Sequence, residues 1–364
     1  MRLLYFTKKD SPHDQRFLRA LAETTHVVYC LRQYACLPNT PDGVTELGWP
    51  MGEPDWSDWK GWCGAAEQLS AILDEVKPDL VHAGPIQGPA LLTGMTEFNP
   101  LVSMSWGSDL LRQAKRSPWM RYATRYTFDH TDVFIGDCQT VTDEAVKYGF
   151  PKNKMVRFPW GVDLAFYSPE NGEKDGQVLR YSLGWDDQFI ILCNRSWSPI
   201  YGVDVLASAF VDVVRENPNC RLLLVGSGSQ SALIRRILTP VVQWVHYAGQ
   251  VERESLPGVY CASDLYVSPS HSDGSSVSLL EALACGRPVL VSDIPSNQEW
   301  VKPGEVGYLF RDNDVLSLKE KILAAAKDPN LDDYGKRART LAEQRADWNA
   351  NFQKLLAAYQ MARA

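Results

Sequence analysis

Short apolar runs alternate with amphipathic stretches along the whole chain. In the first half, apolar runs predict buried strands at residues 3–7, 26–30, 80–82, 101–105 and 133–135. In the second half, similar runs predict strands at residues 189–193, 221–225, 244–248, 265–267 and 289–292. Helix-like stretches, such as 15–23, lie between them. This alternation is typical of doubly wound parallel sheets, so we predict an α/β protein with two Rossmann-like halves.

The middle of the chain has the composition of a linker. Residues 159–176 are rich in glycine, proline and charge, which favours an exposed connection between domains. We therefore predict an N-terminal domain at 1–165, a C-terminal domain at 166–345 and a terminal helix at 346–364. Core packing is the simplest account of an apolar stripe near the end of the chain: Trp348, Phe352, Leu356 and Tyr359.

Length and composition agree with this organisation. The 364 residues suffice for two cores, and 45% hydrophobic with 22% charged residues is ordinary for a globular protein. No apolar run reaches the roughly 18 residues expected of a transmembrane helix, and the first strand is too short for a signal-peptide core. Eight cysteines are scattered without a Cys-x-x-Cys pair, which favours reduced thiols in a cytoplasmic protein.

The stretch 264–293 carries the strongest chemical signal. Gly274, Ser275 and Ser276 stand where a helix is predicted to begin after a strand and a polar loop. Unpaired N–H groups and the helix dipole make such a position suitable for a phosphate. Asp273 precedes this point, and Glu281 lies about 7 Å further along the helix. Two carboxylates around an anion site predict a phosphate linker between hydroxyl-rich groups, as in a nucleotide sugar.

Both acids have simpler explanations. Ser278 and Glu281 fit a capping box, in which the glutamate only satisfies a backbone amide. Asp273 alone would be an ordinary loop acid. Apolar residues surround Glu281, however, so an ionised carboxylate there needs a polar partner, and a ribose diol would be one.

Two parts of this stretch resemble the signature of the family-4 retaining glycosyltransferases of the GT-B fold (group 1 glycosyltransferases). The family has two acids separated by seven residues within Ser-x-x-acid-Gly…Glu-Ala-x-x-x-Gly-x-Pro-Val, and residues 270–274 and 281–289 match this pattern. Asp273 replaces the usual glutamate. A Gly-Val-Asp…Phe…Pro run at 161–169 also matches. The resemblance implies two Rossmann-like domains facing across a cleft, with the donor on the second, the acceptor on the first and a last helix that returns to the first.

Arg195 and three further residues complete the expected donor site. Arg195 follows a predicted strand, and its guanidinium matches a diphosphate and could stabilise a departing nucleotide; a surface arginine paired with an acid is the alternative. The resemblance places the nucleotide near the Gly226 turn and the base at Gln250 and Val251. Relatives carry Lys-Gly after the arginine, whereas this chain has Tyr201 before the glycine and lacks that positive charge.

The candidate acceptor residues follow predicted strands of the first half. His13 and Asp14 come after the first strand, with a helix cap as the equal alternative for Asp14. Trp106 stands where relatives often carry a histidine, and an indole cannot transfer a proton. Asp109 is the best acceptor-side carboxylate, with a helix N-cap as its rival. His82 is interpreted as a structural histidine.

Residues 110–128 form a basic segment with aromatic residues and no acid. A solvated helix face explains it, as does contact with an anionic membrane surface or an anionic acceptor. Its cations are Arg112, Lys115, Arg116, Arg121 and Arg125. Because the net charge is −7, any attraction to anions is local, which also disfavours broad nucleic-acid binding.

These features predict a retaining glycosyltransferase that moves a hexose-type sugar from a nucleotide sugar, with a UDP-sugar favoured, to a glycan, lipid-linked or small-molecule acceptor. Asp273, Arg195 and Asp109 are the expected catalytic residues. The family resemblance implies no metal or other cofactor, and the Asp-x-Asp at 312–314 lies outside the matched motifs. A GT-B phosphorylase, a nucleotide-sugar epimerase or a sugar-nucleotide-binding protein with little turnover remain alternatives. We expect a cytoplasmic location, with peripheral contact at the inner membrane face as an option.

Overall fold

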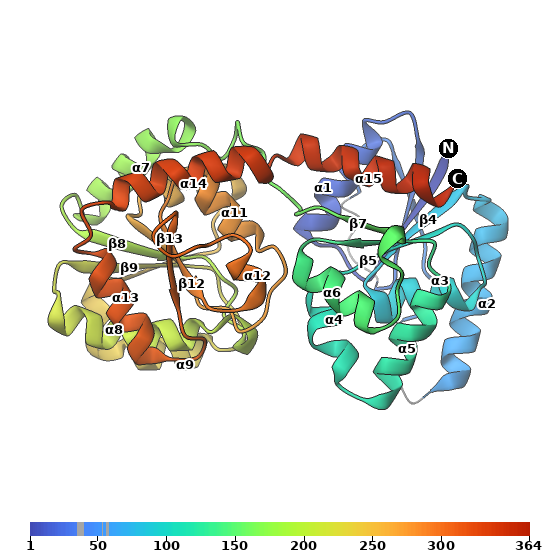
Figure 1. The fold of residues 1–364 in the computed structure, drawn as a ribbon, viewed down its shortest axis with the longest axis horizontal. Helices are drawn as coiled ribbons and strands as arrows, with labels where there is room; N and C mark the ends of the chain where they lie inside the picture. The colour runs from blue at the N-terminus through green and yellow to red at the C-terminus, as the bar shows by residue number, and fades with distance from the viewer. Residues whose placement is uncertain (35–39, 53, 56–57) are drawn as a thin grey trace. The chain divides into compact units, whose positions relative to one another are not determined.

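The chain folds into two compact units. The computed structural model describes residues 1–34, 40–52, 54–55 and 58–364. One unit comprises Met1–Phe158 with Phe352–Ala364, and the other comprises Pro159–Asn351 (Figure 1). The division at 158/159 precedes the sequence-predicted boundary at 165/166, and the last 13 residues belong with the first unit, to which the resemblance implied that the last helix returns.

The first unit is built on a parallel sheet. Its described residues form seven strands in the order β3-β2-β1-β4-β5-β6-β7. The strands are β1 (Arg2–Thr7), β2 (Val27–Arg32), β3 (Val44–Leu47), β4 (Leu80–Gly84), β5 (Leu101–Met104), β6 (Val133–Gly136) and β7 (Met155–Arg157). β1 lies inside the sheet, with Leu4 opposite Tyr29 of β2 and Val81 of β4.

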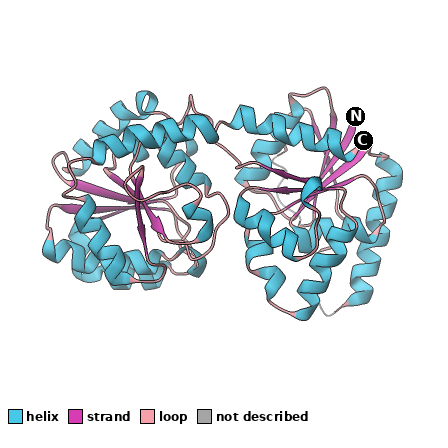
Figure 2. Ribbon diagram, in the orientation of Figure 1, coloured by secondary structure: helices cyan, strands magenta, loops and turns pink. Residues whose placement is uncertain are grey.

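Helices and short turns connect these strands. The helices are α1 (Pro12–Ala22), α2 (Trp59–Val76), α3 (Leu91–Met95), α4 (Ser108–Leu111), α5 (Pro118–Asp129) and α6 (Gln139–Lys147). The shorter turns are η1 (Ile86–Ala90), η2 (Gln113–Lys115) and η3 (Lys152–Lys154). Figure 2 shows the strands enclosed by helices.

The end of the chain packs against the first sheet. α15 (Trp348–Ala362) brings Tyr359 to β4, where its hydroxyl lies 2.7 Å from Nδ1 of His82. His82 is buried, and burial lowers its pKa to about 3, so the ring is neutral at physiological pH. His82 is therefore the structural histidine that the sequence indicates. The two termini lie side by side, with the Arg363 side chain 4.0 Å from Met1 Sδ (Figure 1).

The second unit repeats the plan with a smaller sheet. Its six strands have the order β10-β9-β8-β11-β12-β13 among the described residues. They are β8 (Phe189–Cys193), β9 (Cys220–Val225), β10 (Val245–Gly249), β11 (Leu265–Ser268), β12 (Val289–Ser292) and β13 (Gly307–Phe310). Ile190 and Leu192 of β8 enter one core cluster, whereas Ile191 and Cys193 enter another, so the sheet is buried on both faces.

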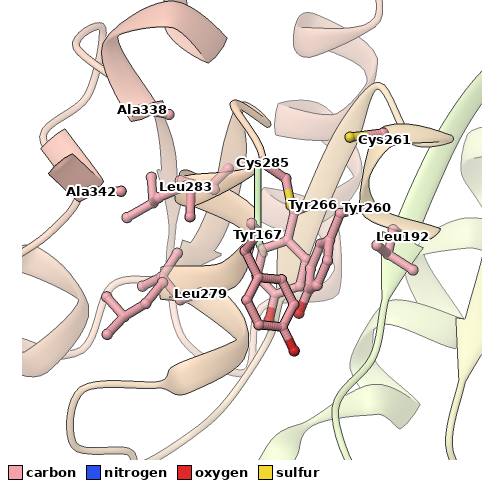
Figure 3. Packing of buried hydrophobic residues seen from close by; sticks show 14 of the residues in the cluster. Tyr167, Leu192, Tyr260, Cys261, Tyr266, Leu279, Leu283, Cys285, Ala338 and Ala342 are labelled. Atoms are coloured by element: carbon pink, nitrogen blue, oxygen red, sulfur yellow. The ribbon is translucent and has the colours of Figure 1, made fainter. Parts of the chain in front are cut away.

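The helices of the second unit are α7 (Pro169–Leu183), α8 (Val203–Glu216), α9 (Ser231–Leu238), α10 (Leu256–Cys261), α11 (Val277–Ala284), α12 (Pro295–Gln298), α13 (Val315–Ala325) and α14 (Leu331–Arg345). Short turns are η4 (Pro199–Tyr201), η5 (Thr239–Trp244) and η6 (Arg253–Ser255). In the core between α10, α11 and the sheet, Figure 3 shows the hydroxyl ends of Tyr167, Tyr260 and Tyr266 on the same side.

The predicted α/β class with two parallel sheets is confirmed, but the linker prediction was too long. Ser168 caps α7, which begins at Pro169, so residues 169–176 are helical. A Cβ at Gly172 would lie 2.4 Å from the Pro257 carbonyl oxygen, and one at Gly176 would lie 2.7 Å from the Ala262 nitrogen. These glycines allow α7 to pack closely on α10. The glycine content of this segment predicted a flexible linker, but in the structure these glycines allow two helices to pack closely.

Other differences concern short or polar elements. The short edge strands β3, β7 and β13 were not predicted, because they are only partly buried and lack the apolar run of the equally short inner strands. The long helical stretch from 334 to 364 is divided, with α14 ending at Arg345 and α15 beginning at Trp348. Within the described ranges, no helix combines the length and apolarity needed to cross a membrane.

Candidate functional site

The polar residues of the second unit gather where its strands end. Arg195 follows β8, Gly226 follows β9, Gln250 follows β10, and Asp273 lies in the loop after β11. Because these strands are parallel, their carboxyl ends meet at one edge of the sheet, where open α/β sheets bind ligands. Sequence reasoning placed the same residues around a donor.

Arg195 connects this loop with the start of α11. Its Nη2 lies 2.5 Å from Oδ2 of Asp273, while Nη1 donates to the hydroxyls of Ser276 at 2.5 Å and Ser278 at 2.8 Å. The guanidinium carbon lies 4.3 Å from the centroid of the Tyr201 ring, a cation–π arrangement. Arg195 is only 9% exposed. It is thus a buried arginine paired with an acid, rather than the surface pair of the alternative interpretation.

Asp273 depends on that arginine for its charge. Burial raises the pKa of the carboxyl group, and the positive charge of Arg195 acts in the opposite direction. The Gly274 amide donates to Oδ1 at 3.0 Å. Removing one member of a buried ion pair commonly costs about 3–5 kcal/mol, because the other charge stays buried without compensation. The pair therefore fixes the loop directly before α11.

The start of α11 differs from the capping-box interpretation. Ser276 is the N-cap residue, so Ser278 lies inside the helix and cannot be the cap. The hydroxyls of both serines face Arg195. Gly274, Ser275 and Ser276 are buried, and Trp300 Nε1 donates to Ser275 Oγ at 3.4 Å. The first N–H groups of a helix have no partner within the helix, which makes this terminus, beside a guanidinium, suitable for an anion.

Glu281 has protein partners that sequence reasoning missed. The Tyr260 hydroxyl donates to Oε2 of Glu281 at 2.7 Å. Burial, followed by the charge of Glu281, raises the pKa values of Tyr167 and Tyr260 well above their ordinary range. Both phenols are therefore protonated donors. Their place beside Glu281 follows from the packing of α10 and α7, and no local pattern signals it.

The Gly226 turn and Gln250 lie together at the ends of β9 and β10. Gly226 has φ +99°, which favours glycine, and its amide donates to the Gly249 carbonyl at 2.6 Å. The Gln250 amide donates to the Ser227 hydroxyl at 3.1 Å. A Cβ at Gly228 would lie 2.4 Å from the Trp197 carbonyl oxygen. Val251 follows as a half-buried residue.

Two acceptor-side candidates meet in the first unit. His13 lies at the start of α1, after β1, and Trp106 lies after β5. Their rings stack with centroids 5.8 Å apart and planes at 26°. Phe17 approaches the same indole, with ring centroids 6.3 Å apart. The structure therefore places an imidazole directly beside the tryptophan that replaces the histidine of relatives.

Asp14 is part of a helix cap. Ser11 is the N-cap of α1; its hydroxyl accepts from the Asp14 amide at 3.2 Å and donates to the Asp14 carboxylate. The Tyr5 hydroxyl donates to Oδ1 of Asp14 at 2.9 Å. Burial raises the pKa of this carboxyl group, and the hydroxyl donors oppose the rise. The N-cap alternative for Asp14 was therefore wrong, because Ser11 is the cap residue and Asp14 contacts its hydroxyl from inside the first turn.

Asp109 fixes a loop in the first unit. Its Oδ2 accepts from the Ile86 amide at 3.0 Å, and Oδ1 accepts from the Ser105 hydroxyl at 2.6 Å. Asp109 is 1% exposed, and burial raises its pKa. The N-cap of α4 is Gly107, so the N-cap alternative was wrong. The side chain instead holds the turn after β4, and its oxygens face the protein rather than solvent.

Two family models match the chain. Residues 187–328 match the family described as "Glycosyl transferases group 1", and residues 2–140 match "Glycosyl transferase 4-like". The two matched ranges correspond to the two sheets, and the first of them contains the Arg195, Asp273 and Glu281 cluster.

Similar proteins include mannosyltransferases and inositol glycosyltransferases. A GDP-mannose-dependent monoacylated alpha-(1-6)-phosphatidylinositol monomannoside mannosyltransferase from Corynebacterium glutamicum is 30% identical over 276 residues, covering 72% of this chain and 71% of the relative. A D-inositol 3-phosphate glycosyltransferase from Gordonia bronchialis is 29% identical over 250 residues, covering 64% of this chain and 53% of that protein. The chain thus spans about half the length of the second relative.

Solved structures agree on the fold. HepE from Anabaena in complex with UDP superimposes with a TM-score of 0.81 at 18% identity, covering 99% of this chain and 100% of that one. WaaG, a glycosyltransferase involved in lipopolysaccharide biosynthesis, gives a TM-score of 0.75 at 17% identity and covers 99% of both chains. With the identity to the corynebacterial enzyme, these matches show that the chain belongs to the group 1, family-4 glycosyltransferases and has the GT-B fold.

Proposed function

We propose that this glycosyltransferase moves a hexose-type sugar from a nucleotide sugar to a lipid-linked, glycan or small-molecule acceptor with retention of configuration. The observation that carries the proposal is the buried Arg195, Asp273 and Ser276 cluster at the start of α11. It combines a guanidinium, a helix N-terminus and a carboxylate at the carboxyl edge of a parallel sheet.

The donor diphosphate would bind at the first turn of α11 beside Arg195. As the bond between the sugar carbon and the phosphate oxygen breaks, its electron pair moves to the phosphate, and the guanidinium stabilises that charge. The acceptor oxygen forms the new bond on the same face. The leaving phosphate oxygen takes the acceptor's proton, so no protein base is required. Asp273 would orient sugar hydroxyls, and Glu281 would bind the ribose.

A direct screen of nucleotide sugars can identify the base. Sequence reasoning favoured UDP, the relative from Corynebacterium glutamicum is named as GDP-mannose-dependent, and HepE was solved with UDP. In our proposal the 226–228 turn and the backbone of Gln250 and Val251 contact the base. Such contacts are made largely by main-chain groups, so UDP-sugars and GDP-sugars should be tested side by side.

We also propose that the reaction needs no metal ion and takes place in the cytoplasm. Arg195 and the start of α11 contribute positive potential at the proposed diphosphate site without a metal ion. All seven cysteines in the described part of the chain have free thiols, in keeping with a reducing compartment. Full transfer activity in the presence of EDTA would support the first point, and activity that returns only with added Mg²⁺ or Mn²⁺ would refute it.

Peripheral contact with an anionic membrane is a further part of the proposal. Tyr122 of α5 is 54% exposed and Trp59 is 53% exposed. The Trp119 ring joins them, with centroids 5.6 Å from Tyr122 and 5.9 Å from Trp59. Exposed cations on the same segment are Arg112, Arg116, Arg121 and Arg125. Exposed aromatic rings beside cations fit the interface of an anionic bilayer.

The membrane contact can be tested with vesicles. Wild-type protein should co-sediment with phosphatidylglycerol vesicles and leave phosphatidylcholine vesicles unbound at low salt. An Arg121→Glu and Arg125→Glu double variant should lose most of this binding. Arg215→Glu, an exposed change on α8, provides the matched control. Equal binding by all three proteins would refute the proposal.

Transfer itself is tested by a donor and acceptor screen. Thermal shift with UDP-sugars and GDP-sugars should identify the donor, and mass spectrometry should identify the product with inositol phosphate, phosphatidylinositol and soluble glycan acceptors. Glu281→Ala should abolish transfer and leave the fold intact. Full activity of that variant would contradict the assignment of Glu281. Donor binding without product from any acceptor would instead support a binding protein with little turnover.

A further inference from the structure

The donor site has too little positive charge for the ligand proposed above. Arg195 contributes one positive charge and is already paired with Asp273. Glu281 adds a second carboxylate about 7 Å along the same helix. A diphosphate linker brings further negative charge into a place where charges are poorly solvated. A second cation is therefore needed close to the Asp273 loop.

His271 is the ionisable residue in the right place. It lies two residues before Asp273, in the loop that follows β11. Its amide donates to the Ile200 carbonyl at 2.9 Å, which joins this loop to the turn before α8. A Cβ built on Gly202 would lie 3.2 Å from both Cε1 and Nε2 of the His271 ring. The imidazole thus packs directly over Gly202, the N-cap residue of α8.

The turn 200–202 contacts both candidate cations. The Arg195 guanidinium packs against the ring of Tyr201, and the His271 ring packs against Gly202. Because the turn is short, these two side chains belong to the same small region at the carboxyl edge of the sheet. The loop after β11 is connected with both of them. The Asp273 carboxylate contacts Arg195, and His271 is itself a residue of this loop.

Asp312 prepares His271 to carry a proton. Its Oδ1 lies 2.7 Å from Nδ1 of His271, just after the carboxyl end of β13. A carboxylate at Nδ1 orients the ring and stabilises the imidazolium form. The side chains of His271 and Asp312 are 25% and 35% exposed, so the pair is open to solvent and can exchange protons. Nδ1 is occupied by Asp312, which leaves Nε2 as the ring nitrogen for a ligand.

We propose that His271, oriented by Asp312, is the second cationic residue of the donor site and donates from Nε2 to the diphosphate of the nucleotide sugar. This inference depends on the proposed glycosyl-transfer function and adds a positioning residue to it. No bond to the protein is formed, and the proton stays on the imidazole during binding. Donor affinity then follows the protonation of one histidine.

The elements around this ring contain further charged groups that influence its protonation. They are Asp312 and Arg311 after β13, Asp204 in the first turn of α8, and Asp273 with its partner Arg195. The carboxylates favour the imidazolium form and the guanidinium groups oppose it. Because only the protonated ring donates from Nε2 while Nδ1 faces Asp312, donor affinity should fall as the pH rises and the ring loses its proton.

Isothermal titration calorimetry with intact nucleotide sugars tests the proposal. UDP-glucose and GDP-mannose are the probes, in EDTA, from about pH 5.5 to 8.5. They are preferable to free nucleoside diphosphates, because a terminal phosphate itself titrates at about pH 6. Wild-type affinity should fall about tenfold across this range. His271→Gln should bind about tenfold more weakly at low pH and show no such fall.

Three companion variants sharpen the result. His271→Lys keeps a cation and should bind tightly across the whole range without a histidine-like pH dependence. Asp312→Asn should move the fall in affinity to lower pH. His246→Gln, on β10, removes a histidine elsewhere in the same unit and should behave as the wild type. Circular dichroism of each variant checks that the fold is retained.

The outcomes separate this inference from the proposed function. If wild-type protein binds neither nucleotide sugar at any pH, the donor site itself is wrong. If it binds and His271→Gln retains both wild-type affinity and pH dependence, the donor site stands and the role of His271 is refuted. A folded His271→Lys variant as weak as His271→Gln would also refute it, because charge rather than shape is the proposed contribution.

Discussion

The carboxyl edges of the two sheets have the same secondary-structure plan but different polar chemistry. In the second unit, Asp273 faces a guanidinium and Glu281 accepts from a phenol. In the first unit, Asp14 and Asp109 are buried and receive hydrogen bonds only from neutral groups among the contacts that the structure describes. The first arrangement keeps ionised groups at a helix start, whereas the second uses carboxyl groups to fix loops.

This difference indicates which polar groups of each unit are available to a charged ligand. An acid that faces a cation can exchange that partner for a charged ligand with little change in net charge. An acid enclosed by amide and hydroxyl donors has its oxygens satisfied, and its burial raises its pKa. We therefore expect changes at the second edge to affect donor binding first and changes at the first edge to affect folding first.

Arg195→Ala should produce the largest effect. It leaves Asp273 partly buried without its cation, so the free energy of unfolding at pH 7 should fall by about 3 kcal/mol, and donor binding should be lost. Urea denaturation and calorimetry measure the two effects. Arg215→Ala removes an exposed arginine paired with Asp212 and should cost less than about 1 kcal/mol. Equal losses for both variants would contradict a special role for the buried pair.

Asp109→Asn should change the pH dependence of stability. Burial raises the pKa of Asp109 in the folded protein, so the folded state binds the proton more tightly than the unfolded state. The contribution of Asp109 to the free energy of unfolding of the wild type is fully present at about pH 4 and below. It decreases as the pH rises through the pKa of the folded state. The variant lacks this decrease. Its size is about 1.4 kcal/mol for each tenfold difference in proton affinity between the folded and the unfolded state.

Urea denaturation of the Asp109→Asn variant and the wild type at about pH 4 and pH 7 tests this sign. The stability of the variant relative to the wild type should improve at the higher pH, whatever the cost of losing one acceptor. A constant difference between the two proteins would show that Asp109 is ionised as easily as in the unfolded chain. Asp273→Asn should show a weaker pH effect, because the Arg195 charge opposes the rise in pKa there.

Tyr260→Phe should separate support of Glu281 from packing. It removes the hydroxyl that donates to Glu281 and keeps the ring within the core, so donor affinity should decrease by about fivefold, or about 1 kcal/mol. Tyr359→Phe removes a buried hydroxyl that faces His82 in the first unit and serves as the matched control. Both should lose similar stability. Loss of donor affinity in the control variant would contradict the assignment of the site to the second unit.

His13→Ala should have the smallest effect on stability. Stacked aromatic pairs contribute about 0.5–1.5 kcal/mol, and His13 is half-buried, so the free energy of unfolding should fall by about 0.5 kcal/mol. If the ring contacts an acceptor, the KM for the acceptor should rise while donor affinity stays unchanged. A change in donor affinity alone would place His13 outside the acceptor side.

The sequence by itself determined the features that depend only on residues close together along the chain. Alternating apolar runs predicted the central strands, because a buried strand of a parallel sheet has a local hydrophobic signature. The Asp273 to Glu281 spacing and the glycine and serines at 274–276 predicted an anion-suited helix start, because helix geometry fixes where such residues lie. The same local motif was sufficient to indicate the family.

Tertiary structure alone decided the partners of the charged side chains. Arg195 and Asp273 are 78 residues apart, His271 and Asp312 are 41 apart, and His82 and Tyr359 are 277 apart. Gly172 and Gly176 were interpreted as part of a linker, because composition does not show that another helix packs against a glycine. Hydrogen bonds and ion pairs between distant residues depend on how helices pack onto sheets, and that packing leaves no periodic signal in the chain.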